Sequence, residues 1–470
     1  MFTPEATRLR WLWQRICSFD RRVAVIWDGH SLSYGELAGR IELWSSRLND
    51  RVGVGEPCAV VGDDTADACA AMLALLFRGA VAVPLCSLPL RLHDRCLTTA
   101  RVSQVVNFTG EAGWQYCRRD PGSAPHPLLE ELNRRGAAGI VLFTSGSSGD
   151  PKAVVWDAEK LIAKHKDRHK TYTTLSMLRL DHIGGLNTLF HTLCGGGTLV
   201  VTRSLKPAAV LDAVQRYRVQ LLPTTPTFLR MMLISRTFEQ FDLSSLELIT
   251  YGTEPMSPGT LEDLCAALPH VRFKQTYGLS EIGILPTQST RSDSVWLRLG
   301  GDDLGIRVVN GTLWVRAPDS MLGYLNAASP LDADGWLNTQ DAVEVEGDAI
   351  RILGRRSEII NVGGEKVYPA EVEEVITRAG NVQEAIVYGQ RNPITGQVVA
   401  AKVRLIQAEA QPQRRIMEIC RARLAPHQVP MIIDFADGPL HNERGKTVRR
   451  KGNQSQHAPA DENEFSEDSP

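Results

Sequence analysis

Residues 143–152, Phe-Thr-Ser-Gly-Ser-Ser-Gly-Asp-Pro-Lys, combine hydroxyls, glycines and one lysine between two apolar runs. The runs, residues 139–143 and 153–156, are typical of short buried strands. Glycine lets the backbone turn its N–H groups toward a phosphate, and Ser and Thr hydroxyls add further donors. The stretch therefore predicts a polyphosphate-binding loop between two strands.

This loop differs from a Walker A loop, because the spacing G-x-x-x-x-G-K-[ST] is absent and a strand is expected to follow it. The alternative is a flexible Ser/Gly loop without chemical use, and the segment taken alone leaves that alternative open. The residues expected to contact phosphate are Thr144, Ser145, Gly146, Ser147, Ser148, Gly149 and Lys152.

Length, charge and cysteine content limit the classes of protein to which the chain can belong. A chain of 470 residues is too long for one ordinary core, so two or more domains are expected. A net charge of −2 gives no electrostatic case for nucleic acid or an anionic membrane. Nine cysteines without a C-x-x-C pair predict reduced thiols and a cytoplasmic protein. The longest apolar stretch, residues 68–85, is interrupted by Arg78 and is too short to span a bilayer.

The order of apolar patterns predicts the fold class. Strand and helix patterns alternate to about residue 285, which indicates a mostly parallel sheet covered by helices. An early helix is expected to begin at Ser33, with Glu36 placed for a capping box. Residues 297–336 carry short strand patterns and the turn Asn310-Gly311, which predicts a smaller β-rich subdomain.

A second, smaller unit is expected from residue 354, because helix and strand patterns there form a separate group. The final residues are polar, acidic and nearly free of apolar side chains, which predicts disorder. We therefore expect an α/β chain with a large N-terminal domain of parallel-rich sheets covered by helices plus the β-rich subdomain (1–353). A small mobile α+β C-terminal domain (354–451) and a disordered tail (452–470) complete it.

Four further segments carry residues suited to nucleotide chemistry. Each has an ordinary structural alternative: a strand-end turn, an exposed acidic turn, a hairpin before a Pro-initiated helix, or a basic tail. In chain order the segments are residues 275–281 (QTYGLSE), 336–341 (WLNTQD), 354–373 (GRRSEIINVGGEKVYPAEVE) and 440–449 (LHNERGKTVR).

Together with the loop at 143–152, these segments resemble the signatures of the acyl-adenylate-forming superfamily. That superfamily contains acyl-CoA synthetases, adenylation domains of peptide synthetases and luciferases. The matches follow the family order along nearly the whole chain. The resemblance implies ATP and Mg²⁺ as cofactors, a small carboxylic acid as substrate, and CoA or a separate carrier protein as acceptor.

Segment 275–281 resembles the family's YGxTE motif, with Ser280 where threonine is usual. The resemblance places Tyr277 against adenine and Ser280 at the phosphate, and makes Glu281 a ligand of Mg²⁺. An oxygen ligand suits a hard cation beside phosphates. Neighbouring residues of this motif and of the preceding adenine-side loop are also expected at the nucleotide, namely Thr276, Gly278, Gly252, Thr253 and Glu254.

The ribose and domain-joining motifs come next. Asp341 resembles the aspartate that binds both ribose hydroxyls, and we expect it at a solvent-facing site; a carboxylate can accept two hydrogen bonds from a diol. Glycine is usual at the position of Gln340, so the sequence does not decide whether the local turn forms. The resemblance implies that Arg355 contacts ribose or phosphate and that Ser357 is a hinge. It also implies that Gly363 and Gly364 let a pantetheine arm pass close to the backbone, where a side chain would block it.

The catalytic lysine implied by the resemblance is Lys446, whose ammonium stabilises charge that moves through the α-phosphate during adenylation. The alternative is a lysine in a basic tail, because Arg449, Arg450 and Lys451 follow. Judged from the residues alone the two interpretations are about even.

The acyl pocket is expected at residues 181–186, which resemble the H-x-x-G segment of acyl- and aryl-CoA synthetases. His182 is expected beside the carboxylate as a further catalytic residue, although a lone histidine is more often structural. Gly184 and Gly185 are expected to leave room for the acyl group, and Thr225 to line the cavity. Asp181 is the only acid nearby that could pair with a substrate ammonium, so an α-amino acid is disfavoured.

The predicted function is ATP-dependent activation of a non-amino carboxylic acid as acyl-AMP, followed by transfer to CoA. One alternative within enzymes is transfer to a separate carrier protein or to an amine. The other is a non-catalytic nucleotide-binding relative, which the presence of Lys152, Asp341 and Lys446 disfavours.

Overall fold

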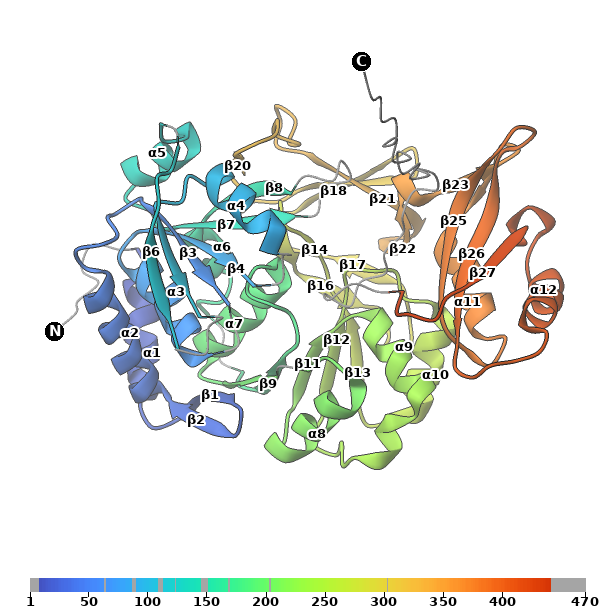
Figure 1. The fold of residues 1–470 in the computed structure, drawn as a ribbon, viewed down its shortest axis with the longest axis horizontal. Coiled ribbons are helices and arrows are strands. Elements are labelled where there is room, and N and C mark those ends of the chain that lie inside the picture. Colours follow the sequence, from blue (N-terminus) through green and yellow to red (C-terminus); the bar gives the residue numbers. More distant parts are fainter. Residues whose placement is uncertain are drawn as a thin grey trace, which may run out of the picture. The chain divides into compact units, whose positions relative to one another are not determined.

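The computed structural model describes residues 8–62, 65–86, 90–108, 113–122, 124–144, 151–167, 170–202, 204–301 and 303–440. Within these residues the chain forms two compact units, one ending at Ser357 and the other beginning at Glu358 (Figure 1). Residues 145–150, Lys446 and the predicted tail lie outside the described residues.

The larger unit contains two seven-stranded sheets. In the first, neighbouring strands are parallel except for the antiparallel pair at one edge. Its order is β13 (Arg272–Gln275), β12 (Leu248–Tyr251), β11 (Leu221–Thr224), β9 (Thr173–Ser176), β10 (Thr198–Val201), β1 (Val23–Trp27) and β2 (His30–Ser33).

The second sheet has four parallel strands inside and antiparallel strands at both edges. Every residue of β3 and β4 is buried, which explains their uninterrupted apolar sequences. The order is β20 (Gly323–Tyr324), β8 (Lys152–Asp157), β7 (Gly139–Thr144), β4 (Val81–Leu85), β3 (Pro57–Val61), β5 (Gln104–Asn107) and β6 (Gln115–Arg118).

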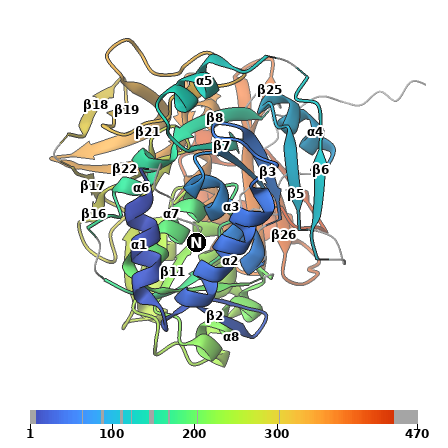
Figure 2. The same ribbon diagram turned by 90° about the vertical axis from the view of Figure 1, so that its left-hand side faces the viewer.

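Helices α3 (Ala66–Phe77) and α7 (Ile183–Gly195) lie between the two sheets, and their apolar residues join both into one core (Figure 1). Helix α3 is buried all round, as an apolar helix between two sheets must be. Helices α1 (Arg10–Phe19) and α2 (Tyr34–Leu48) pack against this layer (Figure 2). The predicted capping box of α2 is confirmed, with Ser33 as N-cap and Glu36 closing it.

Other helices cover the remaining faces. Helices α8 (Pro207–Tyr217), α9 (Pro226–Ser235) and α10 (Pro258–Ala267) bury apolar side chains against the first sheet. Helices α4 (Leu90–Thr99) and α5 (Pro127–Arg134) do so against the second. The short helix α6 (Ala158–Ala163) continues directly from β8. The predicted helix-covered, parallel-rich architecture is therefore confirmed.

The β-rich part of the larger unit is a six-stranded antiparallel sheet and the hairpin of β14 (Tyr277–Leu279) and β15 (Gly283–Leu285). It extends beyond the predicted residues 297–336, because two long strands after Trp336 complete it. Asn310 and Gly311 have φ of 51° and 71°, so the predicted two-residue turn is present. The order is β16 (Thr287–Ser289), β17 (Leu297–Leu299), β22 (Ala349–Arg355), β21 (Leu337–Glu346), β19 (Thr312–Arg316) and β18 (Gly305–Val309).

The smaller unit is an α+β domain with its own core, which includes Val372, Ile376, Ile416 and Cys420. The predicted α+β character of this unit is confirmed, and its mobility stays a prediction. Its elements are β23 (Ile360–Val362), β24 (Glu365–Val367), α11 (Pro369–Thr377), β25 (Val382–Asn392), β26 (Gly396–Leu405), α12 (Pro412–Arg423) and β27 (Ile432–Phe435).

Candidate active site

The two ends of the predicted phosphate loop are fixed by one strand pair. Strand β7 ends at Thr144, β8 begins at Lys152, and these two residues are antiparallel partners. A strand therefore follows the loop, as the sequence predicts. Ser145, Gly146, Ser147, Ser148 and Gly149 lie outside the described residues, so their phosphate contacts stay predictions.

Glu281 lies just after β14 and has a tyrosine partner that the sequence analysis did not find. The hydroxyl of Tyr324 donates to Oε1 of Glu281 over 2.6 Å. The backbone on either side is also fixed: the indole N–H of Trp156 donates to the carbonyl of Ser280 over 2.7 Å, and the Met321 N–H donates to the carbonyl of Glu281 over 2.8 Å. The Glu281 carboxylate is thus held on a rigid support.

Asp341 lies on β21 and is the centre of a three-residue cluster. Its Oδ2 accepts the hydroxyl of Tyr277 over 2.6 Å, and its Oδ1 lies 3.0 Å from Nε of Arg355. Burial, and then the adjacent carboxylate, raise the pKa of Tyr277 well above its usual value, so the phenol remains a donor. The expectation that Asp341 faces solvent is wrong: the residue is 6% exposed, because Tyr277 and Arg355 cover it.

Gln340, which stands where the resemblance leads one to expect glycine, adopts a left-handed backbone conformation. Its φ is 62°, in the left-handed region, and its N–H donates to Oδ1 of Asn338 over 3.0 Å. Strand β21 therefore runs through this position with an irregular register, at a conformational cost that glycine does not carry. Arg355 also donates to the carbonyl of Thr339 over 2.5 Å, which holds this irregular part of β21 from the neighbouring strand.

The adenine-side loop follows β12 and contacts the segment before Tyr277. A Cβ on Gly252 would lie 2.6 Å from Oγ1 of Thr276, so only glycine fits there. Thr253 has φ of 73°, which is strained for a β-branched residue. Glu254 accepts hydrogen bonds from Thr227 at the start of α9, including one of 2.5 Å from its hydroxyl. Gly278 lies in the β14–β15 hairpin, with its partner Ile284.

The predicted acyl-side residues occupy two helix starts. His182 is the N-cap of α7, and its Nδ1 accepts the Gly184 N–H over 3.2 Å; a neutral ring therefore carries its proton on Nε2. A Cβ on Gly185 would lie 1.9 Å from the Arg179 carbonyl, so this glycine is required by packing. Thr225 caps α9 by accepting the Phe228 N–H over 3.2 Å. Their contacts with an acyl group stay predictions.

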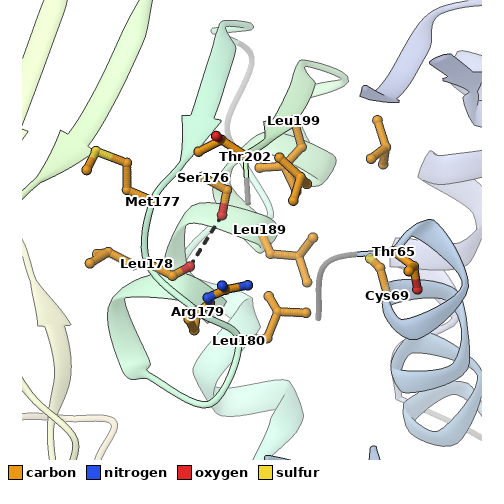
Figure 3. A pocket seen from close by; sticks show the side chains of 12 residues that line it. Thr65, Cys69, Ser176, Met177, Leu178, Arg179, Leu180, Leu189, Leu199 and Thr202 are labelled. Carbon is orange, nitrogen blue, oxygen red and sulfur yellow. Dashed lines mark hydrogen bonds between the residues drawn. The ribbon is translucent and has the colours of Figure 1, made fainter. Parts of the chain in front are cut away.

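A small cavity is lined by the segment that Gly184 and Gly185 contact. Ser176, Met177, Leu178, Arg179 and Leu180 surround it from one side and Cys69 from α3 from another (Figure 3). Its volume is about 20 Å³, which suffices for little more than one water molecule. An acyl group does not fit in this cavity.

The smaller unit carries the two glycines expected to pass a pantetheine arm. Gly363 and Gly364 have φ of 59° and 96°, which explains the residue type by backbone conformation. Among the residues that the structure describes, leaving out its two chain neighbours, no heavy atom lies within 4 Å of a Cβ built on Gly364. Ser357, the predicted hinge, is the last residue of the larger unit.

The described residues fit a nucleotide better than a metal held by protein alone. In the described part of the chain no group of three or more His, Cys, Asp or Glu side chains could hold a metal ion. Glu281 supplies a carboxylate beside the phosphate-loop strand, so Mg²⁺ would need phosphate oxygens for its remaining ligands, as this ion commonly does. Within the same described residues, no helix has both the length and the apolar character needed to cross a bilayer.

Several known proteins are similar to this chain. The indoleacetate–CoA ligase of Aromatoleum aromaticum is 28% identical over 70% of this chain and 67% of that ligase. The 2-succinylbenzoate–CoA ligase of Bacillus velezensis is 28% identical over 94% of this chain and 97% of that ligase. The solved structure of the anthranilate CoA ligase AuaEII with anthranoyl-AMP shares the fold, with a TM-score of 0.78 at 17% identity, and covers 93% of this chain and 94% of that one.

Family membership follows from a match across most of the chain. The family of AMP-binding enzymes matches residues 12–325, and the C-terminal domain of AMP-binding enzymes matches residues 371–446. The motif segments read from the sequence lie within or between these ranges, except that the last one extends three residues past 446, and the resemblance to adenylate-forming enzymes is confirmed. The chain belongs to the AMP-binding enzyme family.

Proposed function

We propose that this chain is an AMP-forming acid–thiol ligase that activates a small non-amino carboxylic acid with ATP and transfers the acyl group to CoA. The observation that supports the proposal is the presence, in one compact unit, of three features that are expected to bind the nucleotide. These are Lys152 at the end of the phosphate loop, the carboxylate of Glu281, and the cluster of Tyr277, Asp341 and Arg355.

The first step is a nucleophilic displacement at phosphorus. A carboxylate oxygen attacks the α-phosphate, the α–β phosphoanhydride bond breaks, and acyl-AMP and pyrophosphate form. Lys152 is proposed to bind the leaving phosphates, with Thr144 and the loop residues, and Asp341 to bind the ribose. Lys446 is proposed to stabilise the charge at the α-phosphate. The second step breaks the acyl–phosphate bond: the thiol sulfur attacks the acyl carbon, loses its proton and releases AMP.

Magnesium is proposed to bind with the phosphates of ATP, and Glu281 would hold it from the protein side. When bound, the ion neutralises charge on the phosphate oxygens. The Tyr324 hydroxyl already fixes one carboxylate oxygen of Glu281, so the other oxygen can face the ion.

The proposed acid lacks an α-amino group. Asp181, the one acid near the acyl segment, is 2% exposed and its Oδ2 accepts the Cys86 N–H over 3.1 Å, so it supports the backbone. The ligases for indoleacetate and 2-succinylbenzoate are both named for non-amino acids. An aryl or medium-sized acyl acid is therefore the proposed class.

The smaller unit is proposed to be a mobile lid that turns about Ser357 between the two steps. The compact units divide directly after this residue, and serine can absorb the backbone change that a hinge requires. The lid would present Lys446 for adenylation, and Gly363 with Gly364 for thiol transfer. A separate carrier protein or an amine in place of CoA is the alternative acceptor.

The test is ATP–pyrophosphate exchange against a panel of aryl, medium-chain, long-chain and amino acids. Each acid that supports exchange is then incubated with ATP and CoA, and the thioester is measured by mass. Exchange with an aryl or medium-sized acid, followed by its CoA thioester, is expected. Absence of exchange with every acid, in a protein that is folded and binds no ATP, would overturn the proposal. Exchange without formation of a CoA thioester would indicate that the acceptor is a carrier protein or an amine.

A further inference from the structure

We propose that Tyr324 is a positioning residue that holds the Glu281 carboxylate for magnesium and orients the Lys152 ammonium for the phosphates of ATP. Tyr324 belongs to none of the segments that carry the nucleotide motifs in the sequence. It lies on β20, more than forty residues after Glu281 and far after Lys152, and it contacts both. The inference rests on the proposed function, because it assumes that ATP and magnesium bind here.

The hydroxyl of Tyr324 acts on Glu281. It donates to Oε1 over 2.6 Å, a short bond to an ionised acceptor, which is the stronger kind of hydrogen bond. An ionised carboxylate can only accept hydrogen bonds, so the Tyr324 hydroxyl is the donor in this pair. One oxygen of the carboxylate is thereby fixed, and the orientation of the other oxygen follows from it.

The ring of Tyr324 acts on Lys152. The Nζ of Lys152 lies 5.2 Å from the ring centroid, within the range of a cation–π interaction. A lysine has four side-chain torsions, and this contact restricts where its ammonium can lie. One rigid side chain therefore contacts both charges, the positive charge of Lys152 over its ring and the negative charge of Glu281 at its hydroxyl.

The backbone of this segment is tied to the strand that carries Lys152. Strand β20 pairs with β8, with Tyr324 opposite Val154. Two residues on, the Asn326 side chain accepts the Ala153 N–H over 2.9 Å and donates to the Pro151 carbonyl over 2.9 Å. Asn326 thus clamps the residues directly before and after Lys152. Such a support holds a binding group more closely than a surface loop could.

The competing explanation is that Tyr324 only fills space in the core. The residue is 7% exposed and belongs to the core cluster between the two sheets, so some loss of stability is expected from any substitution. The two explanations differ for Tyr324→Phe. That change keeps the ring and its packing and removes only the hydroxyl.

The experiment measures metal binding directly. Wild type and Tyr324→Phe are saturated with α,β-methylene-ATP, which cannot be cleaved between the α- and β-phosphates, and Mn²⁺ is titrated with electron paramagnetic resonance as readout. We expect Tyr324→Phe to weaken Mn²⁺ binding about 5- to 30-fold, in keeping with loss of a hydrogen bond to a charged group. Its metal-free affinity for the nucleotide, measured by calorimetry, is expected to stay within about twofold, because the ring still contacts Lys152.

A second variant separates the two roles. Tyr324→Leu removes the ring as well, so it is expected to weaken metal-free nucleotide binding a further 3-fold or so. Tyr34→Phe is the matched control: its hydroxyl donates to the Gly197 carbonyl over 2.8 Å within the core, away from these motifs. This control is expected to lower the melting temperature and leave Mn²⁺ binding unchanged.

The outcomes distinguish this inference from the proposed function. Wild type that binds neither nucleotide nor Mn²⁺ contradicts the proposed function. Wild type that binds both, with Tyr324→Phe equal to it in Mn²⁺ affinity and lower only in melting temperature, overturns the positioning role. Equal loss of Mn²⁺ affinity in Tyr34→Phe and Tyr324→Phe also overturns it, because the effect would then be general destabilisation.

Discussion

The hydroxyl of Tyr277 lies 2.6 Å from Oδ2 of Asp341, although 64 positions separate the two residues in the chain. The bond joins the adenine motif on β14 to the ribose motif on β21. Arg355 on β22 holds the second oxygen of the same carboxylate at 3.0 Å. The groups expected to bind the base and the ribose therefore hold each other in position without a nucleotide. This reduces the conformational entropy that the side chains lose when a nucleotide binds.

Replacing Asp341 with asparagine is expected to weaken ATP binding with little loss of stability. The amide oxygen can still accept the Tyr277 hydroxyl, but the ion pair with Arg355 and one acceptor for the ribose are lost. The KM for ATP in pyrophosphate exchange should rise about 10- to 100-fold, the range for a hydrogen bond to a charged group. By contrast, Asp341→Ala leaves the buried Tyr277 hydroxyl without this acceptor, and its free energy of unfolding should also fall by about 1–3 kcal/mol.

The control for the two Asp341 variants is Asp348→Asn, in the turn between β21 and β22. Asp348 pairs with Arg298 at 2.7 Å but is well exposed, so neither ATP binding nor stability should change measurably. An unchanged KM for ATP in Asp341→Asn, together with a clear loss of stability, would show that the carboxylate has only a structural role.

Gln340→Gly is expected to stabilise the larger unit. Gln340 has φ of 62°, and glycine adopts that conformation without the steric cost that other residues carry. The free energy of unfolding should rise by about 0.5–1 kcal/mol in urea titration, after allowance for the greater freedom of glycine in the unfolded chain. Gln340→Ala keeps the strained backbone and serves as control. Equal stability of the two variants would show that the conformation of residue 340 is not the cause.

Local patterns predicted the strands around the phosphate loop and the capping box at Ser33, and both are present. Motif spacing singled out Tyr277 and Asp341 as expected nucleotide residues, and the structure brings the two side chains into contact. The burial of Asp341 and the contact of Tyr324 with Glu281 could not be predicted in this way, because both depend on strands that meet only after the sheets form. No residue spacing marks a pairing between β20 and β8.

Gly185→Ala is expected to destabilise the larger unit strongly. A Cβ at this position would lie 1.9 Å from the carbonyl oxygen of Arg179, and backbone atoms cannot yield as a flexible side chain can. We expect a loss of at least about 2 kcal/mol in the free energy of unfolding. Gly39→Ala is the matched control within helix α2. In the described part of the chain, apart from neighbouring residues and the helix's own backbone, no heavy atom lies within 4 Å of the new Cβ, so this variant should gain about 0.5–1 kcal/mol. A stable Gly185→Ala protein with altered acid preference would favour the acyl-pocket role instead.

Stability is expected to fall as the pH rises above about 10. Burial raises the pKa of Tyr34, Tyr251 and Tyr277 in the folded protein. A group with a raised folded pKa contributes fully below its unfolded pKa and loses that contribution as the pH rises toward the folded value. Each such tyrosine should lower the free energy of unfolding by about 1.4 kcal/mol per pH unit in this range. Urea titrations between about pH 8 and 11 measure how the free energy of unfolding changes with pH. Tyr34→Phe should make this dependence less steep by the contribution of one tyrosine. Complete ionisation of all nine tyrosines in a protein that is still folded would contradict the assignment.

Lys446→Ala is expected to impair the first step of the proposed reaction selectively. If the Lys446 ammonium stabilises the charge that develops at the α-phosphate, its loss should slow pyrophosphate exchange about 100-fold or more. This corresponds to an increase of about 3 kcal/mol in the activation free energy. The step from synthetic acyl-AMP and CoA to thioester has no charge developing toward pyrophosphate, so it should retain most of its rate. Lys451→Ala, in the same basic segment, is the matched control and should leave both steps intact. Near wild-type exchange in Lys446→Ala would show that Lys446 has no catalytic role and is, like its basic neighbours, a residue of the tail. Equal loss of both steps would instead indicate that Lys446 contributes to folding or to nucleotide binding in general.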